Sequence, residues 1–196
     1  KTDQTITFPA IGAQWTTNRV GLAATASSGL SVSFSMLSGS ASIIGTNLTF
    51  TGAGSVSIVA SQAGDANWNA APRVTNTFTV NLATQADLSF EPTSPQVYAT
   101  TNNLSQSGGS GSGSTNYYVL SGPGVIITNS EPVGPLPSMM RPASAKLTVT
   151  SGTGVVLVVA TKTASALYAA RSVTGVVYCT RAEQAVDFTA LGDQFW

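Results

Sequence analysis

Polar and apolar residues alternate with a period of two along most of this chain. The clearest case is residues 30–37, in which Leu30, Val32, Phe34 and Met36 share one face and serines occupy much of the other. That period is typical of antiparallel strands with one face on a core and the other in water. No segment keeps a period of 3.6 residues, so the pattern predicts an all-β protein with little or no helix.

Short alternating runs bounded by glycine, proline and serine predict strands throughout the first part of the chain. They cover residues 3–8, 20–26, 30–37, 41–44, 47–51, 55–61 and 73–80. Seven short strands within about 80 residues favour a β-sandwich, which we expect to have Greek-key connections.

A long stretch of the sequence occurs twice. LTFTGAGSVSIVASQAGDANWNAA at 48–71 returns as LTVTSGTGVVLVVATKTASALYAA at 147–170. Repetition over this length indicates two copies of one module. We therefore predict one β-sandwich in residues 1–82 and a second in residues 83–182, with a short joint at residues 81–85.

The chain begins the module a third time near its last residue. QAVDFTALGDQFW at 184–196 matches QTITFPAIGAQW at 4–15, so residues 183–196 are predicted to hold the first strand of a third module. Nothing in this chain would complete that module. Gln184, Val186, Phe188, Leu191 and Trp196 are therefore candidates for a strand-exchange segment, which could complete another chain's sandwich by β-strand addition.

The second copy departs from the first in two places. SGGSGSGS at 107–114 falls between its second and third predicted strands, where we expect a long mobile hairpin loop. A proline-rich insertion occupies 129–146, and its four prolines argue against a central strand there. Leu136, Met139 and Met140 give the insertion apolar surface. We expect a loop folded over the edge of the sandwich, with a contact site as the alternative.

Several strings resemble a known family. QTITFPAIG, LAATASSGLSVSF, LSGSASIIG and the repeated stretch look like the immunoglobulin-like repeats of large bacterial surface and secreted proteins. The second copy, with LSFEPTSPQVYATTNNLSQSGGSGSGSTNYYVLSGPG, looks like a sister subtype that alternates with the first. The resemblance implies tandem immunoglobulin-like sandwiches outside the cell, with neighbouring modules as partners. It leaves function open, because such repeats occur in adhesins, stalks and multidomain enzymes alike.

Composition excludes several kinds of chemistry. The chain has eight Lys plus Arg, eight Asp plus Glu and no His, and its formal net charge is zero. Without His, neither a Ser-His-Asp or Cys-His arrangement nor a usual Cys/His zinc site can form, and we expect no enzyme, cofactor or metal. A net charge of zero gives no strongly positive surface of the kind that binds nucleic acid. No apolar run reaches the roughly 18 residues of a transmembrane helix. Cys179, the only cysteine, is expected to be a small buried hydrophobic residue.

One aromatic residue recurs at the same place in both copies of the repeated stretch, as Trp68 and Tyr168. Exposed rings could stack on sugars, whereas packed rings would plug one end of each sandwich. The recurrence favours the plug, because a repeated core position needs the same filling.

These observations leave three functions open. We favour a non-catalytic structural module of an extracellular bacterial surface protein, acting as a spacer, stalk or adhesin repeat. The second is a subunit or segment of an extracellular filament assembled by β-strand complementation. The third is a carbohydrate-binding or adhesive module that contacts surface glycans or protein receptors through Trp68, Tyr168 or the proline-rich insertion.

Overall fold

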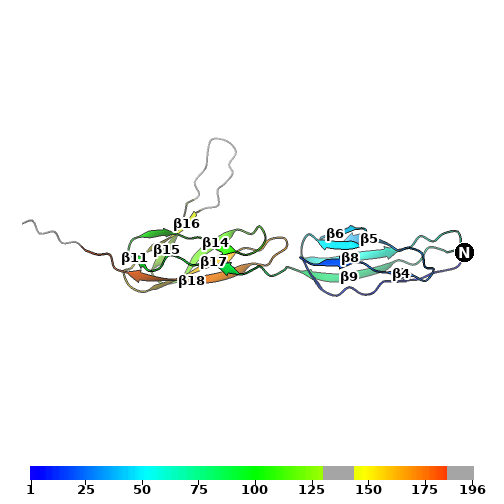
Figure 1. Ribbon diagram of the computed structural model, residues 1–196, viewed down its shortest axis with the longest axis horizontal. Coiled ribbons are helices and arrows are strands. Elements are labelled where there is room, and N and C mark those ends of the chain that lie inside the picture. Colours follow the sequence, from blue (N-terminus) through cyan, green and yellow to red (C-terminus); the bar gives the residue numbers. More distant parts are fainter. Residues whose placement is uncertain (130–143, 185–196) are drawn as a thin grey trace, which may run out of the picture. The chain divides into compact units, whose positions relative to one another are not determined.

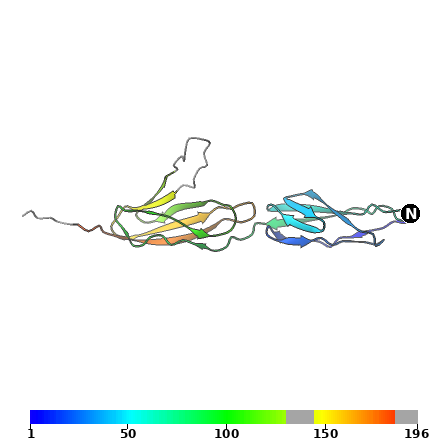
Figure 2. The same cartoon turned by 45° about the horizontal axis from the view of Figure 1, so that its top comes forward.

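The computed structural model describes residues 1–129 and 144–184 (Figure 1). These residues form strands and loops, and none of them lies in a helix. Among them there is accordingly no helix long and apolar enough to cross a membrane. The strands build two β-sandwiches with the same topology, so the prediction of tandem all-β, immunoglobulin-like sandwiches is confirmed (Figure 2).

The first sandwich packs a four-stranded sheet, in the order β2-β9-β8-β5, against a three-stranded sheet, in the order β3-β7-β6. A short pair, β1-β4, completes it. β2 runs parallel to β9, and the other pairs are antiparallel. Its strands are β1 (Ile6–Thr7), β2 (Gln14–Trp15), β3 (Arg19–Gly21), β4 (Thr25–Ala26), β5 (Ser33–Ser38), β6 (Ala41–Ile44), β7 (Asn47–Phe50), β8 (Gly54–Ser61) and β9 (Val74–Asn81).

The second sandwich repeats this order strand for strand, as β11-β18-β17-β14, β12-β16-β15 and β10-β13. β11 runs parallel to β18, as β2 does to β9. Its strands are β10 (Leu88–Ser89), β11 (Gln96–Val97), β12 (Thr101–Asn103), β13 (Ser107–Gly108), β14 (Thr115–Ser121), β15 (Gly124–Asn129), β16 (Ser144–Val149), β17 (Val155–Lys162) and β18 (Arg171–Thr180).

The early part of each sandwich differs from the sequence-based prediction. The strand predicted over residues 20–26 is interrupted, and residues 22–24 separate β3 from β4. β2 was not predicted at all, because a two-residue strand is too short to show a period. It exists through its parallel pairing with β9, in which Gln14 lies opposite Val80.

In sequence, the proline-rich insertion spans the end of β15, the residues between β15 and β16, and the start of β16. We expected a strand only from residue 147, but β16 begins at Ser144 and pairs with β15 as far as Asn129. The four prolines fall in sequence between these two strands and not within them, so they do not prevent the pairing. Residues 130–143 lie outside the described residues.

The glycine-rich segment predicted as a mobile loop contains regular structure at its start. Ser107 and Gly108 form β13, which pairs with β10. Further along, Thr163 N donates to Ser114 O (2.8 Å), and a Cβ on Gly113 would lie 2.0 Å from Thr163 O. Glycine is therefore required at Gly113 because two backbones approach closely there.

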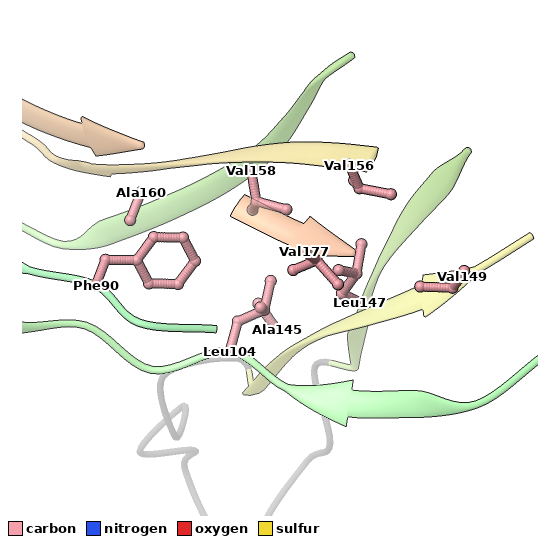
Figure 3. Close-up of a cluster of buried hydrophobic side chains, with 9 residues drawn as sticks. All are labelled: Phe90, Leu104, Ala145, Leu147, Val149, Val156, Val158, Ala160 and Val177. Atoms are coloured by element: carbon pink, nitrogen blue, oxygen red, sulfur yellow. The ribbon is translucent and has the colours of Figure 1, made fainter. Parts of the chain in front are cut away.

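Each sandwich has its core between its two sheets. Leu48, Val56 and Ile58 are fully buried in the first, and Leu147, Val156 and Val158 occupy the matching positions of the second (Figure 3). An aromatic pair also recurs. The ring centroids of Phe8 and Phe34 are 5.3 Å apart, and those of Phe90 and Tyr117 are 5.5 Å apart.

The chain divides into two compact units. The first contains residues 1–87 together with 108–114 and 162–171, and the second contains the other described residues. The sheets fall on either side of the predicted boundary at residues 82–83, but that boundary itself stays a prediction.

Candidate functional site

A buried glutamine lies near the start of the first sandwich. Gln4 is only 3% exposed. Its Nε2 donates to Gln62 Oε1 and to Asn69 O, each at 2.6 Å, and its Oε1 accepts from the Ser28 hydroxyl. Buried amides are stable only when bonded in this way, so Gln4 ties the start of the chain to the loop after β8.

Gln85 holds the corresponding place in the second sandwich and is 2% exposed. Its Nε2 donates to Thr163 O (3.1 Å), and its Oε1 accepts from Ser110 N (3.2 Å). Arg171 donates to Gln85 O (2.9 Å) and forms an ion pair with Asp87. These glutamines were not predicted as anchoring residues from the sequence. The signal was present, because a glutamine opens each repeat.

Trp68 and Tyr168 lie in equivalent loops and are both half-buried. Trp68 forms a parallel β-bridge with Thr2, and Tyr168 forms the same bridge with Ala83. In each loop the carbonyl of the aromatic residue accepts a bond from the residue three positions earlier, at 3.1 Å for Trp68 and 2.9 Å for Tyr168. The backbone of both loops is thus fixed, and neither ring belongs to a described core cluster. Whether the rings plug the sandwiches or bind a ligand stays a prediction.

The described residues contain no group of three or more His, Cys, Asp or Glu side chains that could hold a metal ion. Cys179 is half-buried against the second core. Burial raises the pKa of Tyr117 above its ordinary value, while a hydrogen bond with the backbone of Gln106 opposes the rise. Because Tyr117 packs on Phe90 within the core, this shift reflects structure and not a reactive site.

An open groove of about 470 Å³ lies on the flank of the first sandwich. Its walls are largely apolar and include Ala24, Val32 and Phe34, with Thr46 at its margin. The groove is lined by residues that connect β3 to β4 and by Thr46 in the turn of the β6–β7 hairpin.

The corresponding position of the second sandwich lies within the longer β15–β16 hairpin. Leu22 N donates to Thr46 O (2.7 Å) in the first sandwich, and Leu104 N donates to Ala145 O (2.8 Å) in the second. Thr46 therefore corresponds to Ala145. Ala145 is 5% exposed and belongs to the core of the second sandwich, whereas Thr46 is exposed.

Most of the other predicted contact residues lie outside the described residues. These are Leu136, Met139 and Met140 of the insertion, and Val186, Phe188, Leu191 and Trp196 of the predicted strand-exchange segment. Gln184 is described and exposed, and it helps to line a hollow of about 690 Å³ with Tyr98, Gly152 and Arg181.

No protein-family model matches this chain, and no curated protein matches it. Among solved structures, the D00-D0 domain of intimin is 15% identical over 90% of this chain and 99% of its own, with a TM-score of 0.31. Domains 4 and 5 of the S-layer protein SbsC are 9% identical over 90% and 97%, with a TM-score of 0.36. The human desmocollin-1 ectodomain is 12% identical over 92%, with a TM-score of 0.35, and this chain spans 42% of it. At these values the likenesses say nothing about function.

Proposed function

We propose that this chain is a non-catalytic structural part of an extracellular bacterial surface protein, acting as a spacer, stalk or adhesin repeat. The observation that supports it is the path of the chain through each sandwich. Thr2 bridges to Trp68 at one end of the first sandwich, and β9 leaves from the opposite end, beside Trp15. Ala83 and β18 repeat this path in the second. A module whose first and last segments lie at opposite ends can be joined to further modules in a linear series.

The pairing of an early strand with the last strand of each sandwich also suits a part that bears tension. β2 and β9 run parallel and side by side, as do β11 and β18. A force applied to the two ends of a sandwich pulls such strands in opposite directions along their lengths. It therefore loads several hydrogen bonds at once, in shear, which resists better than opening them one by one.

Force spectroscopy on the full chain, held by its two ends, tests this role. We expect two separate unfolding steps, each releasing roughly 29–36 nm less the length of the folded sandwich, as extension of 80 to 100 residues at about 3.6 Å per residue requires. A chain that extends without two discrete steps would contradict a tension-bearing role.

Tyr98→Pro provides the matched variant. Tyr98 N donates to Thr180 O (2.8 Å) at the end of β11, and proline has no N–H to donate. The side chain is 49% exposed, so little packing is lost. We expect the second sandwich to unfold at a lower force and the first to keep its unfolding force as an internal control. Equal forces in the variant and the wild type would show that this pairing carries no load.

A filament is the second candidate, and its support comes from the repeat. Residues 184–196 match residues 4–15, and in the first sandwich that segment supplies β1 and β2, which pair with β4 and β9. The same segment of one chain could supply those strands to another chain. Electron micrographs of purified protein test this: fibres support it, and dispersed particles at every concentration count against it.

The half-buried rings of Trp68 and Tyr168 support the third candidate, a glycan-binding module. Binding on a glycan array that is lost in Trp68→Ala, with the melting temperature unchanged, would favour it. Unfolding of that variant would instead favour the plug.

A further inference from the structure

The outer face of one sheet in the second sandwich is apolar. In β14, β17 and β18 alternate residues point inward to the core, among them Tyr117, Val158 and Val177. The residues between them point outward. We call the following set the apolar face: Tyr118, Leu120, Val155, Leu157, Val159, Val176 and Tyr178, of which Leu157 is half-buried and Val159 is only 5% exposed.

The register of the strands brings these side chains together. Cys179 N donates to Gly154 O (3.0 Å), and the hydroxyl oxygens of Thr161 and Ser172 are hydrogen-bonded at 2.7 Å. Both pairs fit one antiparallel register, which places Tyr178 beside Val155. The same register places Val176 beside Leu157.

On the other side of β17, Thr163 N donates to Ser114 O (2.8 Å), which places Tyr118 beside Val159. β14, β17 and β18 are neighbouring strands of one sheet (Figure 1), so the apolar face forms one continuous patch.

The fold does not require apolar residues at these positions. At five of the seven, the first sandwich carries a hydroxyl residue instead: Ser35, Ser55, Ser57, Thr77 and Thr79. Two of these hydroxyls, on Ser57 and Thr77, are hydrogen-bonded to each other at 2.8 Å. Leu157 and Val176 replace that pair in the second sandwich. Because the same sheet forms with either set, the apolar face serves something outside its own sandwich.

We propose that the apolar face binds the same face of a second copy of this chain, sheet against sheet. The face holds no charged side chain, and the chain has a net charge of zero, so two identical faces do not repel each other. Flat sheet faces pack well at a separation of about 10 Å. A glycan fits less well, because the only side-chain polar atoms on the face are the hydroxyls of Tyr118 and Tyr178.

The exposed area is sufficient for a specific dimer. Tyr118, Leu120, Val155, Val176 and Tyr178 are 40% to 60% exposed. Together they expose on the order of 500 Å² per copy, hence about 1,000 Å² for two copies before any rim is counted, near the lower limit for a specific interface. A two-fold axis parallel to β17 would also set Tyr118 of one copy against Thr174 of the other, a large side chain against a smaller one.

Sedimentation equilibrium of the full chain, from about 10 μM to about 1 mM, tests the proposal. We expect a dimer that forms with rising concentration. The double variant Leu157→Ser, Val176→Thr introduces the pair that the first sandwich already tolerates, and we expect its dimerisation to be at least about tenfold weaker. The control is Ile44→Ser, which removes a side chain of the first sandwich that is 77% exposed and lies off the apolar face; its dimerisation should equal that of the wild type.

A wild-type chain that stays monomeric over the whole range would overturn the proposal, whether the natural occupant is a glycan or another protein. A double variant that dimerises like the wild type would also overturn it. If the double variant does not fold, Tyr178→Thr, which copies Thr79, decides in the same way. The spacer role does not depend on this result, because the force experiment tests it on single molecules.

Discussion

Replacing Gln4 by leucine should selectively destabilise the first sandwich. Leucine is apolar and of similar bulk, so the change removes hydrogen bonds without opening a large cavity. Three bonds are lost: two donated by Nε2, to Gln62 Oε1 and Asn69 O, and one accepted from the Ser28 hydroxyl. Because Gln4 is 3% exposed, water cannot take its place in the site.

The partners limit the loss. Gln62 Oε1 keeps a bond from Gly64 N, and Asn69 is exposed, so its carbonyl can turn to water. Three net hydrogen bonds at about 1 kcal/mol each, reduced by the apolar burial of leucine, leave a loss of about 2 kcal/mol in the free energy of unfolding. For a domain of this size that corresponds to a fall in melting temperature of about 8–16 °C.

Scanning calorimetry of the full chain measures this change, and Gln14→Leu is the control. Gln14 lies in the same sandwich but is only half-buried, and both of its side-chain bonds are local: Nε2 donates to Gly12 O in an exposed bond of 3.2 Å, and Oε1 accepts from Asn18 Nδ2 at 2.9 Å. We expect its loss to be within about 0.5 kcal/mol. If Gln4→Leu lowers the melting temperature no more than Gln14→Leu does, the buried glutamine does not anchor the chain and the reasoning is refuted.

Three further predictions concern the second sandwich and the whole chain. Gly122→Ala should lower the free energy of unfolding by more than about 2 kcal/mol, because φ is +96° and the new Cβ would lie 2.0 Å from Val155 O. Gly45→Ala, with φ of +64° and nothing within 4 Å, should cost only about 1 kcal/mol, and equal urea midpoints would contradict this contrast. Burial holds the pKa of Tyr117 above its ordinary value of 10.0, so the folded state keeps a proton that the unfolded state loses. Stability should therefore fall as the pH rises past about 10, and Tyr117→Phe should reduce that fall in urea titrations. Finally, a chelator should leave the melting temperature unchanged within about 1 °C, and a drop of tens of degrees would reveal a structural cation.

The period of two located most of the longer strands, because a strand with one buried face must alternate. β8 and β17 were found in this way, and the repeat then located the matching core residues Leu48 and Leu147. β2 could not be found. It has two residues and is defined by a parallel partner far away in the sequence, so no local pattern marks it.

The buried glutamines and the apolar face escaped prediction for different reasons. Gln4 looks like any surface residue of a polar chain, and only its distant partners, Gln62 and Asn69, show that it is buried. The apolar face was visible as a run of valines in β17, but such a run does not tell which side of a strand is covered. That distinction needed the exposure of Val155 and Tyr178.

The two sandwiches differ mainly at outward positions, where the fold does not require a particular kind of residue. Inward positions hold similar residues, such as Ile58 and Val158, because the same space between two sheets must be filled in both. Outward positions carry no such requirement, yet Ser57 becomes Leu157 there. An apolar residue gains nothing in water, so a cluster of such changes on one face indicates contact with something beyond the sandwich. The lengthened hairpin of β15 and β16 is the other large difference, and it lies in the same sandwich. The first sandwich therefore serves as a reference for the fold, and the activity that distinguishes this chain should be sought on the second.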